Sequence, residues 1–172
     1  MEKPYRASES GFYVVGLETR TSKTLEDNPQ TARIPALWER ARQENLEEQI
    51  PRRLAKGHPF CVYFDYENGH TGAYSVVVGY QVPGLEDVPP GLTGLSIPGG
   101  KYLVFTAEPQ DVAQTWAAVW DYFAQPGAPR RAFTYDYEEY FPRPQGGVEY
   151  RGSGTASRGE GRDEVRIYVA VR

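Results

Sequence analysis

The residues best suited to chemistry lie together in one segment, residues 133–141, where three acids alternate with aromatic side chains. This composition predicts a β-strand, and successive side chains of a strand point to opposite faces. Asp136, Glu138 and Tyr140 then share one face, whereas Glu139 lies with aromatic neighbours on the other. If the first face lines a cleft, its carboxylates and phenol suit an organic cation. An acidic face open to water is the alternative.

Metal and cofactor signals are weak. His58 and Cys61 have an H-x-x-C spacing, but His70 is the only other His and the sequence has no second Cys, so a closed zinc site lacks ligands. Residues 94–98 miss the last glycine of a G-x-S-x-G nucleophile elbow, and the Gly- and Ser-rich residues 152–157 lack the spacing of a phosphate-binding loop. We therefore expect neither a metal nor a cofactor.

Tyrosine is unusually common, because the chain has 13 Tyr against 7 Phe and 3 Trp. A buried phenol needs a hydrogen-bond partner, so some of these hydroxyls can serve a polar site. Tyr63, Tyr66, Tyr74 and Tyr80 fall in one predicted hairpin, where they either line a pocket or pack between strands. The tryptophans of the second predicted helix are core residues by default.

The elements that would position these residues repeat along the chain. The first half is expected to form a strand at 12–19, a helix at 34–48 and two strands at 60–66 and 73–82. A connection is expected at 23–30, after the first strand. In the helix, Ile34, Leu37, Trp38 and Ala41 follow helical spacing, and Pro35 suits a first turn. A Pro- and Gly-rich connection is expected at 83–100.

The second half repeats this order: residues 102–106, 112–123, 132–141 and 164–171. Asp111 and Gln114 have the spacing of a capping box, and Pro126 with Gly127 ends the helix. The Gly-, Arg- and Ser-rich stretch between the last two strands predicts a long, mobile hairpin loop.

This repetition predicts an α+β fold of two pseudo-symmetric βαββ units within a single domain of residues 1–172, with halves at about 1–95 and 96–172. Each unit would form an antiparallel sheet with one main helix, and a ligand cleft would lie between the two sheets. An ordinary α+β domain whose halves match by chance is the alternative.

Composition narrows the function. The 172 residues carry 19 basic and 23 acidic side chains, a net charge of −4, which argues against a nucleic-acid-binding surface. No run of apolar residues is long enough to cross a membrane. The single Cys and the polar N-terminus, which has no signal peptide, indicate a cytoplasmic protein.

Six segments in order resemble the GyrI-like small-molecule-binding family, which also supplies the effector-binding domains of AraC-type and multidrug-responsive activators: residues 12–17, 34–38, 72–82, 97–102, 136–140 and 165–171. The resemblance implies an SHS2-type duplication and places the acid of the family's F-E-x-Y-like element on Glu138, with Glu139 as the runner-up. Nothing ahead of residue 12 resembles a DNA-reading module, so a stand-alone binding domain is expected.

The main hypothesis is therefore a stand-alone binder of bulky, lipophilic, cationic aromatic molecules. The expected ligand-binding residues comprise acids and aromatic side chains: Glu138, Tyr140, Trp38, Tyr66, Tyr74, Trp116, Trp120 and, as the runner-up acid, Glu139. One alternative is a hydrolase of reactive cyclopropane-type electrophiles, with Glu138 as general base. Another is a protein that binds and inhibits gyrase. We expect no direct nucleic-acid or membrane partner.

Overall fold

The computed structural model describes residues 3–142 and 164–172. Within these ranges the strands are β1 (Tyr5–Glu9), β2 (Phe12–Ser22), β3 (Phe60–Phe64), β4 (Ala73–Val82), β5 (Thr93–Ile97), β6 (Gly100–Ala107), β7 (Tyr135–Phe141) and β8 (Glu164–Ala170). The helices are α1 (Lys23–Glu26), α2 (Ile34–Gln43), α3 (Leu46–Gln49) and α4 (Val112–Ala124), the last preceded by a short 3-10 turn (Pro109–Asp111). The expected α+β class is confirmed.

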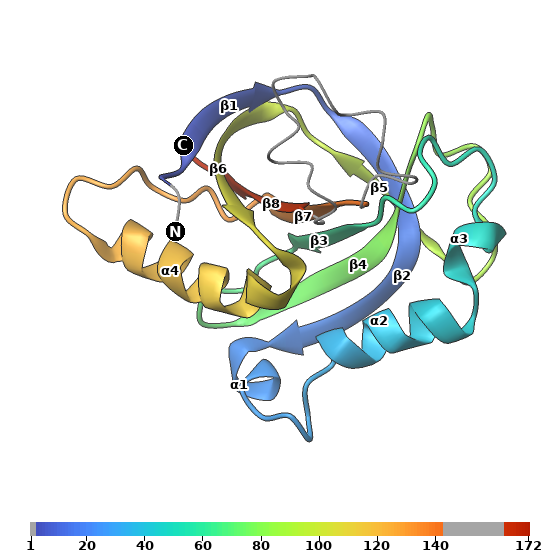
Figure 1. Ribbon diagram of the computed structural model, residues 1–172, viewed down its shortest axis with the longest axis horizontal. Coiled ribbons are helices and arrows are strands. Elements are labelled where there is room, and N and C mark those ends of the chain that lie inside the picture. Colours follow the sequence, from blue (N-terminus) through green and yellow to red (C-terminus); the bar gives the residue numbers. More distant parts are fainter. Residues whose placement is uncertain (1–2, 143–163) are drawn as a thin grey trace, which may run out of the picture.

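All of these strands form one antiparallel sheet, in the order β1-β6-β8-β7-β3-β4-β2-β5 (Figure 1). The expected hairpin of β3 and β4 is confirmed, with Val62 opposite Val77. The expectation of two separate sheets is wrong, because β3 and β7 pair at the centre and bring Cys61 opposite Glu138. The expected cleft between two sheets is therefore absent from the described part of the chain.

The strand pairing has a regular pattern. β2 pairs with β4, and β6 pairs with β8, so the first strand of each predicted unit lies beside its third. The two edge strands are exchanged, because β1 pairs with β6 while β5 pairs with β2. The origin of this pattern in a duplication stays a prediction.

The sheet is strongly curled, and the long strand β2 bends round one side of it (Figure 1). Gly16 of β2 lies opposite Gly79 of β4. A Cβ atom added to Gly16 would lie 2.0 Å from the carbonyl oxygen of Val78, and one added to Gly79 would lie 2.1 Å from that of Val15. Only a residue without a side chain allows the two backbones to approach this closely.

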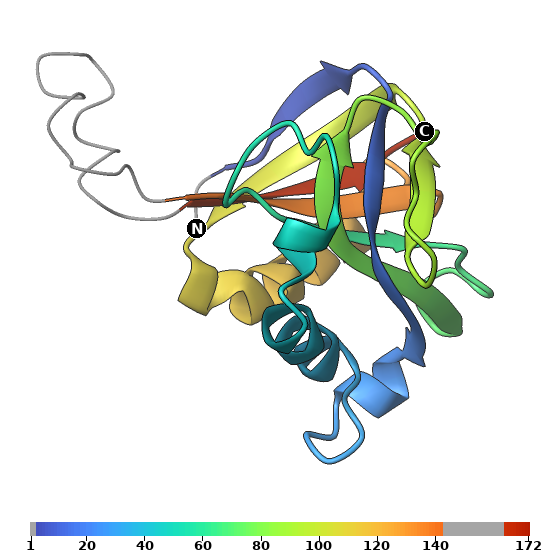
Figure 2. The ribbon, with the colours of Figure 1, turned by 90° about the vertical axis from the view of Figure 1, so that its right-hand side faces the viewer.

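The two faces of the sheet are covered differently. The helices all lie on one side (Figure 2), where α2 and α3 cover a cluster around Leu17 and Val76, and α4 covers a second cluster around Phe105 and Ile167. The other face carries an aromatic core in which Tyr137 and Tyr168 stack with ring centroids 4.5 Å apart. The two helix clusters meet at the central strands, because Tyr140 of β7 packs against both of them.

Several local expectations are corrected. The helix expected over 34–48 breaks at Asn45, whose φ of 53° is left-handed, so α2 ends before α3 begins. The strand expected from 132 starts at Tyr135, because Phe133 also has a positive φ of 55°. The connections expected at 23–30 and 83–100 contain α1 and β5 respectively.

The capping box is also wrong, because Asp111 makes no side-chain cap hydrogen bond to α4. β1 was not expected. The long hairpin loop lies outside the described residues. No helix in the described ranges has the length and apolar character needed to span a membrane.

Candidate ligand-binding site

A pocket of about 600 Å³ lies between α1 and α2 on one side and α4 on the other, with strands β3, β4 and β7 as its floor; we call it the central pocket. Seven of the eight residues expected in the site line it: Trp38, Tyr66, Tyr74, Trp116, Trp120, Glu138 and Tyr140. All three tryptophans of the chain are among them. The residues that the sequence picked from four separate segments are therefore brought together.

Periodicity explains how the elements present these side chains. On α4, Val112, Trp116 and Trp120 are spaced by four residues and so lie on one helix face, which points to the pocket. On β7, Glu138 and Tyr140 are two residues apart and share a strand face. The alternation predicted for this strand is confirmed, because Tyr137, the residue before Glu138, lies in the aromatic core of the opposite face.

Glu138 is the central polar group of the pocket, and only 2% of it is exposed. Its Oε2 accepts hydrogen bonds from Tyr63 Oη at 2.7 Å and from Trp116 Nε1 at 2.6 Å. Its Oε1 accepts one from Tyr140 Oη at 2.5 Å. All three donors are electrically neutral, and Glu138 forms no ion pair with any described residue. The pocket thus carries a buried carboxyl group without a cationic partner.

Two opposing effects set the protonation of this group. Burial raises the pKa of Glu138, because a carboxylate loses its hydration, while the hydrogen bonds from Tyr140, Trp116 and Tyr63 act in the opposite direction. Burial is the larger effect. The carboxylate in turn contributes to raising the pKa of the buried Cys61 thiol, after the burial of that thiol itself. A cation in the pocket would relieve the cost of the buried charge.

The aromatic walls are held by contacts among the rings. Tyr63 and Trp116 meet edge to face with centroids 5.5 Å apart, and Trp38 and Tyr140 do so at 5.0 Å. Tyr74 adjoins Tyr63 at 6.0 Å. Edge-to-face pairs of this kind add stability beyond the area that they bury. The rings that would contact a ligand are therefore positioned before it arrives.

Asp136, on the same strand face as Glu138, is fully buried but does not line the pocket. Its carboxylate accepts hydrogen bonds from Tyr66 Oη at 2.5 Å, Arg131 Nη2 at 2.7 Å and the backbone N–H of Ala170 at 2.8 Å. Its charge is therefore compensated within the chain. Through these contacts it positions Tyr66 and Arg131, both of which line the pocket.

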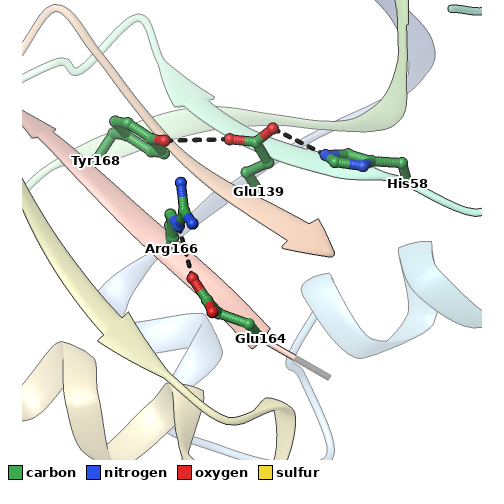
Figure 3. Close-up of polar contacts among 5 residues, drawn as sticks. All are labelled: His58, Glu139, Glu164, Arg166 and Tyr168. Atoms are coloured by element: carbon green, nitrogen blue, oxygen red, sulfur yellow. Dashed lines mark hydrogen bonds and ion pairs between the residues drawn. The ribbon is translucent and has the colours of Figure 1, made fainter. Parts of the chain in front are cut away.

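Glu139, the runner-up acid, does not line the central pocket. Its Oε2 lies 2.8 Å from His58 Nε2, and its Oε1 accepts a hydrogen bond from Tyr168 Oη at 3.2 Å (Figure 3). Tyr168 belongs to the aromatic core on the helix-free face of the sheet. Of the two neighbouring glutamates, only Glu138 lines the pocket.

The mouth of the pocket is formed by a helix that the sequence analysis missed. Lys23 of α1 lies with its Nζ 5.5 Å from the centroid of the Trp120 ring and forms an ion pair with Asp27 at 2.8 Å. Glu26 accepts a hydrogen bond from the backbone N–H of Arg33 at 2.8 Å, just before α2. The signal that could have revealed α1 is Ser22, whose side chain caps the helix by accepting a hydrogen bond from the backbone N–H of Leu25.

No metal site accompanies this pocket: the described part of the chain has no group of three or more His, Cys, Asp or Glu that could hold an ion. Tyr63 also lines the pocket, although the expected set left it out. It had been weighed as either pocket or packing, and its hydroxyl turns out to bind Glu138 directly.

Comparison with known proteins identifies the family. The chain matches Cass2, the integron-associated effector binding proteins, over residues 8–171, and so belongs to this family. The expected effector-binding family is thereby confirmed. No curated protein matches the chain significantly.

Solved structures agree with this assignment. An integron cassette protein from the mobile metagenome of Vibrio cholerae, VCH_CASS2, is 28% identical with a TM-score of 0.73, and the match covers 98% of this chain and 95% of that one. SAV2435 bound to tetraphenylphosphonium is 17% identical with a TM-score of 0.70, covering 99% and 94%. A putative transcription regulation protein from Staphylococcus aureus MU50 is 17% identical with a TM-score of 0.63, covering 98% of each chain. The last two likenesses concern the fold alone.

Proposed function

We propose that this member of the integron-associated effector-binding family binds bulky, lipophilic, cationic aromatic molecules in the central pocket, with Glu138 as their counter-charge. One observation carries the proposal. Glu138 is buried in a wall of aromatic rings, accepts three hydrogen bonds from neutral donors, and has no cationic partner among the described residues.

The hydrogen bonds matter because they stabilise the ionised form of the carboxyl group without cancelling its charge. Because only 2% of Glu138 is exposed, its charge acts on a ligand more strongly than it would in bulk solvent. The surrounding rings add to this attraction, since each aromatic face that contacts a desolvated cation contributes about 1 to 2 kcal/mol. A few such contacts together with the carboxylate support micromolar affinity, or about −8 kcal/mol.

Selectivity is expected to be loose. The polar side chains around the carboxyl group are already committed to it, because Tyr63, Trp116 and Tyr140 all donate to Glu138. These three donors are then not free to recognise a ligand by directional hydrogen bonds. Charge, size and flatness would decide what binds, and a volume of about 600 Å³ is within the range of pockets for drug-sized molecules.

One solved structure of similar fold supports the same class of ligand. SAV2435, a protein of similar fold, has been solved with tetraphenylphosphonium bound, and that compound is a lipophilic aromatic cation. This chain has the aromatic walls and the carboxylate that such a cation requires.

A cytoplasmic place of action fits the single Cys of the chain, which is a buried free thiol.

The geometry favours binding over the hydrolase alternative. A general base has to accept a proton from a water that it holds, and a carboxylate has about four lone-pair positions. Three of these positions on Glu138 already accept hydrogen bonds from the protein. A binding role needs only the charge, which these contacts leave in place.

The test uses two ions of equal size and opposite charge, tetraphenylphosphonium and tetraphenylborate. All three tryptophans line the pocket, so the intrinsic fluorescence of the protein reports on binding there. We expect saturable quenching by the phosphonium at micromolar concentration, and binding of the borate at least tenfold weaker. Equal affinity for the two ions would mean that the pocket recognises aromatic surface only, and would refute the role of the carboxylate.

A further inference from the structure

A second pocket adjoins the first, and its charge is opposite. It has a volume of about 510 Å³ and shares Trp120, His70 and Arg131 with the central pocket. Two further arginines line it, Arg130 and Arg172, and no acidic side chain does. We call it the arginine pocket. The central pocket, by contrast, is lined by three carboxylates and two cationic side chains, Lys23 and Arg131.

Backbone pairing holds the arginines together. The N–H of Arg172 donates to the carbonyl oxygen of Arg130 at 2.9 Å, and Arg131 forms an antiparallel bridge with Val171. The segment before β7 is thereby fixed beside the segment that follows β8. Arg130 and Arg172 form no ion pair within the part of the chain that the structure describes. Their guanidinium groups therefore lie at one pocket without a described acidic side chain paired to either of them.

Arg131 forms the shared wall. Its side chain is only 9% exposed, and its guanidinium lies 4.3 Å above the ring of Phe133. One hydrogen bond joins its Nη2 to Asp136, but its buried Nε has no partner among the described atoms. A guanidinium has five N–H donors, so Arg131 keeps donating capacity at the junction of the two pockets. Arginine is well suited to bind carboxylate and related anions.

We propose that the arginine pocket is a subsite for an anionic group, so that the chain takes amphoteric aromatic ligands, with a cationic part at Glu138 and a carboxylate or sulfonate at the arginines. The proposal rests on the proposed function of the central pocket for the position of the cation. The aromatic rings of Trp120 and Phe133, both in the lining of the arginine pocket, supply apolar area for the linking part of the ligand.

The test compares a matched pair of ligands, (4-carboxybutyl)triphenylphosphonium and its methyl ester. The two share the aromatic cation and the tether, and only the acid carries a negative charge. Both are titrated into the full chain at low ionic strength, with tryptophan fluorescence and calorimetry as readouts. We expect the acid to bind about three- to tenfold more tightly than the ester, and the difference to shrink as salt is added.

Variants then locate the effect. Arg130→Gln and Arg172→Gln should each lower the affinity for the acid about threefold and leave the affinity for the ester unchanged. The matched control is Arg6→Gln, because Arg6 is an exposed arginine that lines neither pocket and its loss changes the net charge equally. It should leave the ratio of the two affinities unchanged.

The outcomes separate the two proposals. If the ester binds but the acid binds no more tightly, the anionic subsite is wrong while the central site stands. If the acid binds more tightly than the ester in the wild type and in Arg130→Gln and Arg172→Gln alike, the anionic group of the ligand lies elsewhere, and the proposed subsite is again wrong. If neither compound binds, the proposed function fails, and the amphoteric ligand class fails with it.

Discussion

Replacing Glu138 by Gln is the most informative perturbation, because it removes one charge and keeps the shape of the side chain. The three donors around it can adapt, since Gln offers one oxygen acceptor and the hydroxyls of Tyr63 and Tyr140 can rotate to accept from its amide. The pocket should therefore keep its volume and its aromatic walls. What changes is the attraction for a cation.

The size of that change follows from Coulomb's law. In tetraphenylphosphonium the charged phosphorus is surrounded by four rings, so it stays about 6 Å from a carboxylate. At an effective dielectric constant of about 20, the attraction between the phosphonium and the carboxylate charge is then about 3 kcal/mol. We therefore expect Glu138→Gln to weaken phosphonium binding about a hundredfold, since each 1.4 kcal/mol is tenfold. Tetraphenylborate should bind more tightly to the variant than to the wild type, because the same term is repulsive for an anion.

Calorimetric titration measures both ions on the wild type and the variant, and Glu139→Gln is the control. It makes the same change in net charge one residue further along β7, in a side chain that points away from the central pocket. We expect it to bind both ions like the wild type. A loss of phosphonium affinity below threefold in Glu138→Gln, or an equal loss in Glu139→Gln, would refute the role assigned to Glu138.

Three further expectations concern the same pocket. Because burial raises the pKa of Glu138, phosphonium affinity should fall as the pH is lowered through that raised value, while Glu138→Gln should show no such titration. The same raised pKa affects stability, because the folded state holds the proton of the Glu138 carboxyl group more tightly than the unfolded state does. The free energy of unfolding of the wild type should therefore fall as the pH rises from the unfolded pKa of this group through its raised pKa. In urea unfolding, Glu138→Gln should be more stable than the wild type at pH 7, and the difference should disappear in acid. Lys23→Met should tighten phosphonium binding about threefold, because it removes the ammonium that lies over the Trp120 ring at the mouth of the pocket; unchanged or weaker binding would show that Lys23 does not compete with the ligand.

The floor and inner walls of the site were predictable because they depend on local periodicity. Alternation along residues 133–141 put Glu138 and Tyr140 on one face, and helical spacing put Trp116 and Trp120 on another. Alternation alone would have singled out Glu139, as the lone acid on the apolar face, whereas the family resemblance favoured Glu138, which lines the pocket. The structure separates the two glutamates because neighbouring residues of a strand point to opposite faces, and the helices that border the pocket lie on only one of these faces (Figure 2).

The parts that could not be predicted depend on contacts far apart in the sequence. The pairing of β3 with β7 joins what looked like two sheets, and no local pattern encodes it. The carboxylate of Asp136 looked equivalent to that of Glu138 until the structure placed Arg131 and the N–H of Ala170 against it. The arginine pocket depends in the same way on the meeting of the segments around Arg130 and Arg172.

The exchange of the edge strands bears on how the molecule unfolds and how it could be divided. β1 forms the edge of the sheet beside β6, and β5 forms the other edge beside β2. Each group of four consecutive strands, β1–β4 and β5–β8, therefore has its edge strand paired with a strand of the other group. Neither group can open without breaking backbone hydrogen bonds in both, which favours a single cooperative transition. A chain cut in the segment between β4 and β5 should yield two fragments that aggregate or stay unstructured apart and recover the tryptophan environment of the intact protein when mixed.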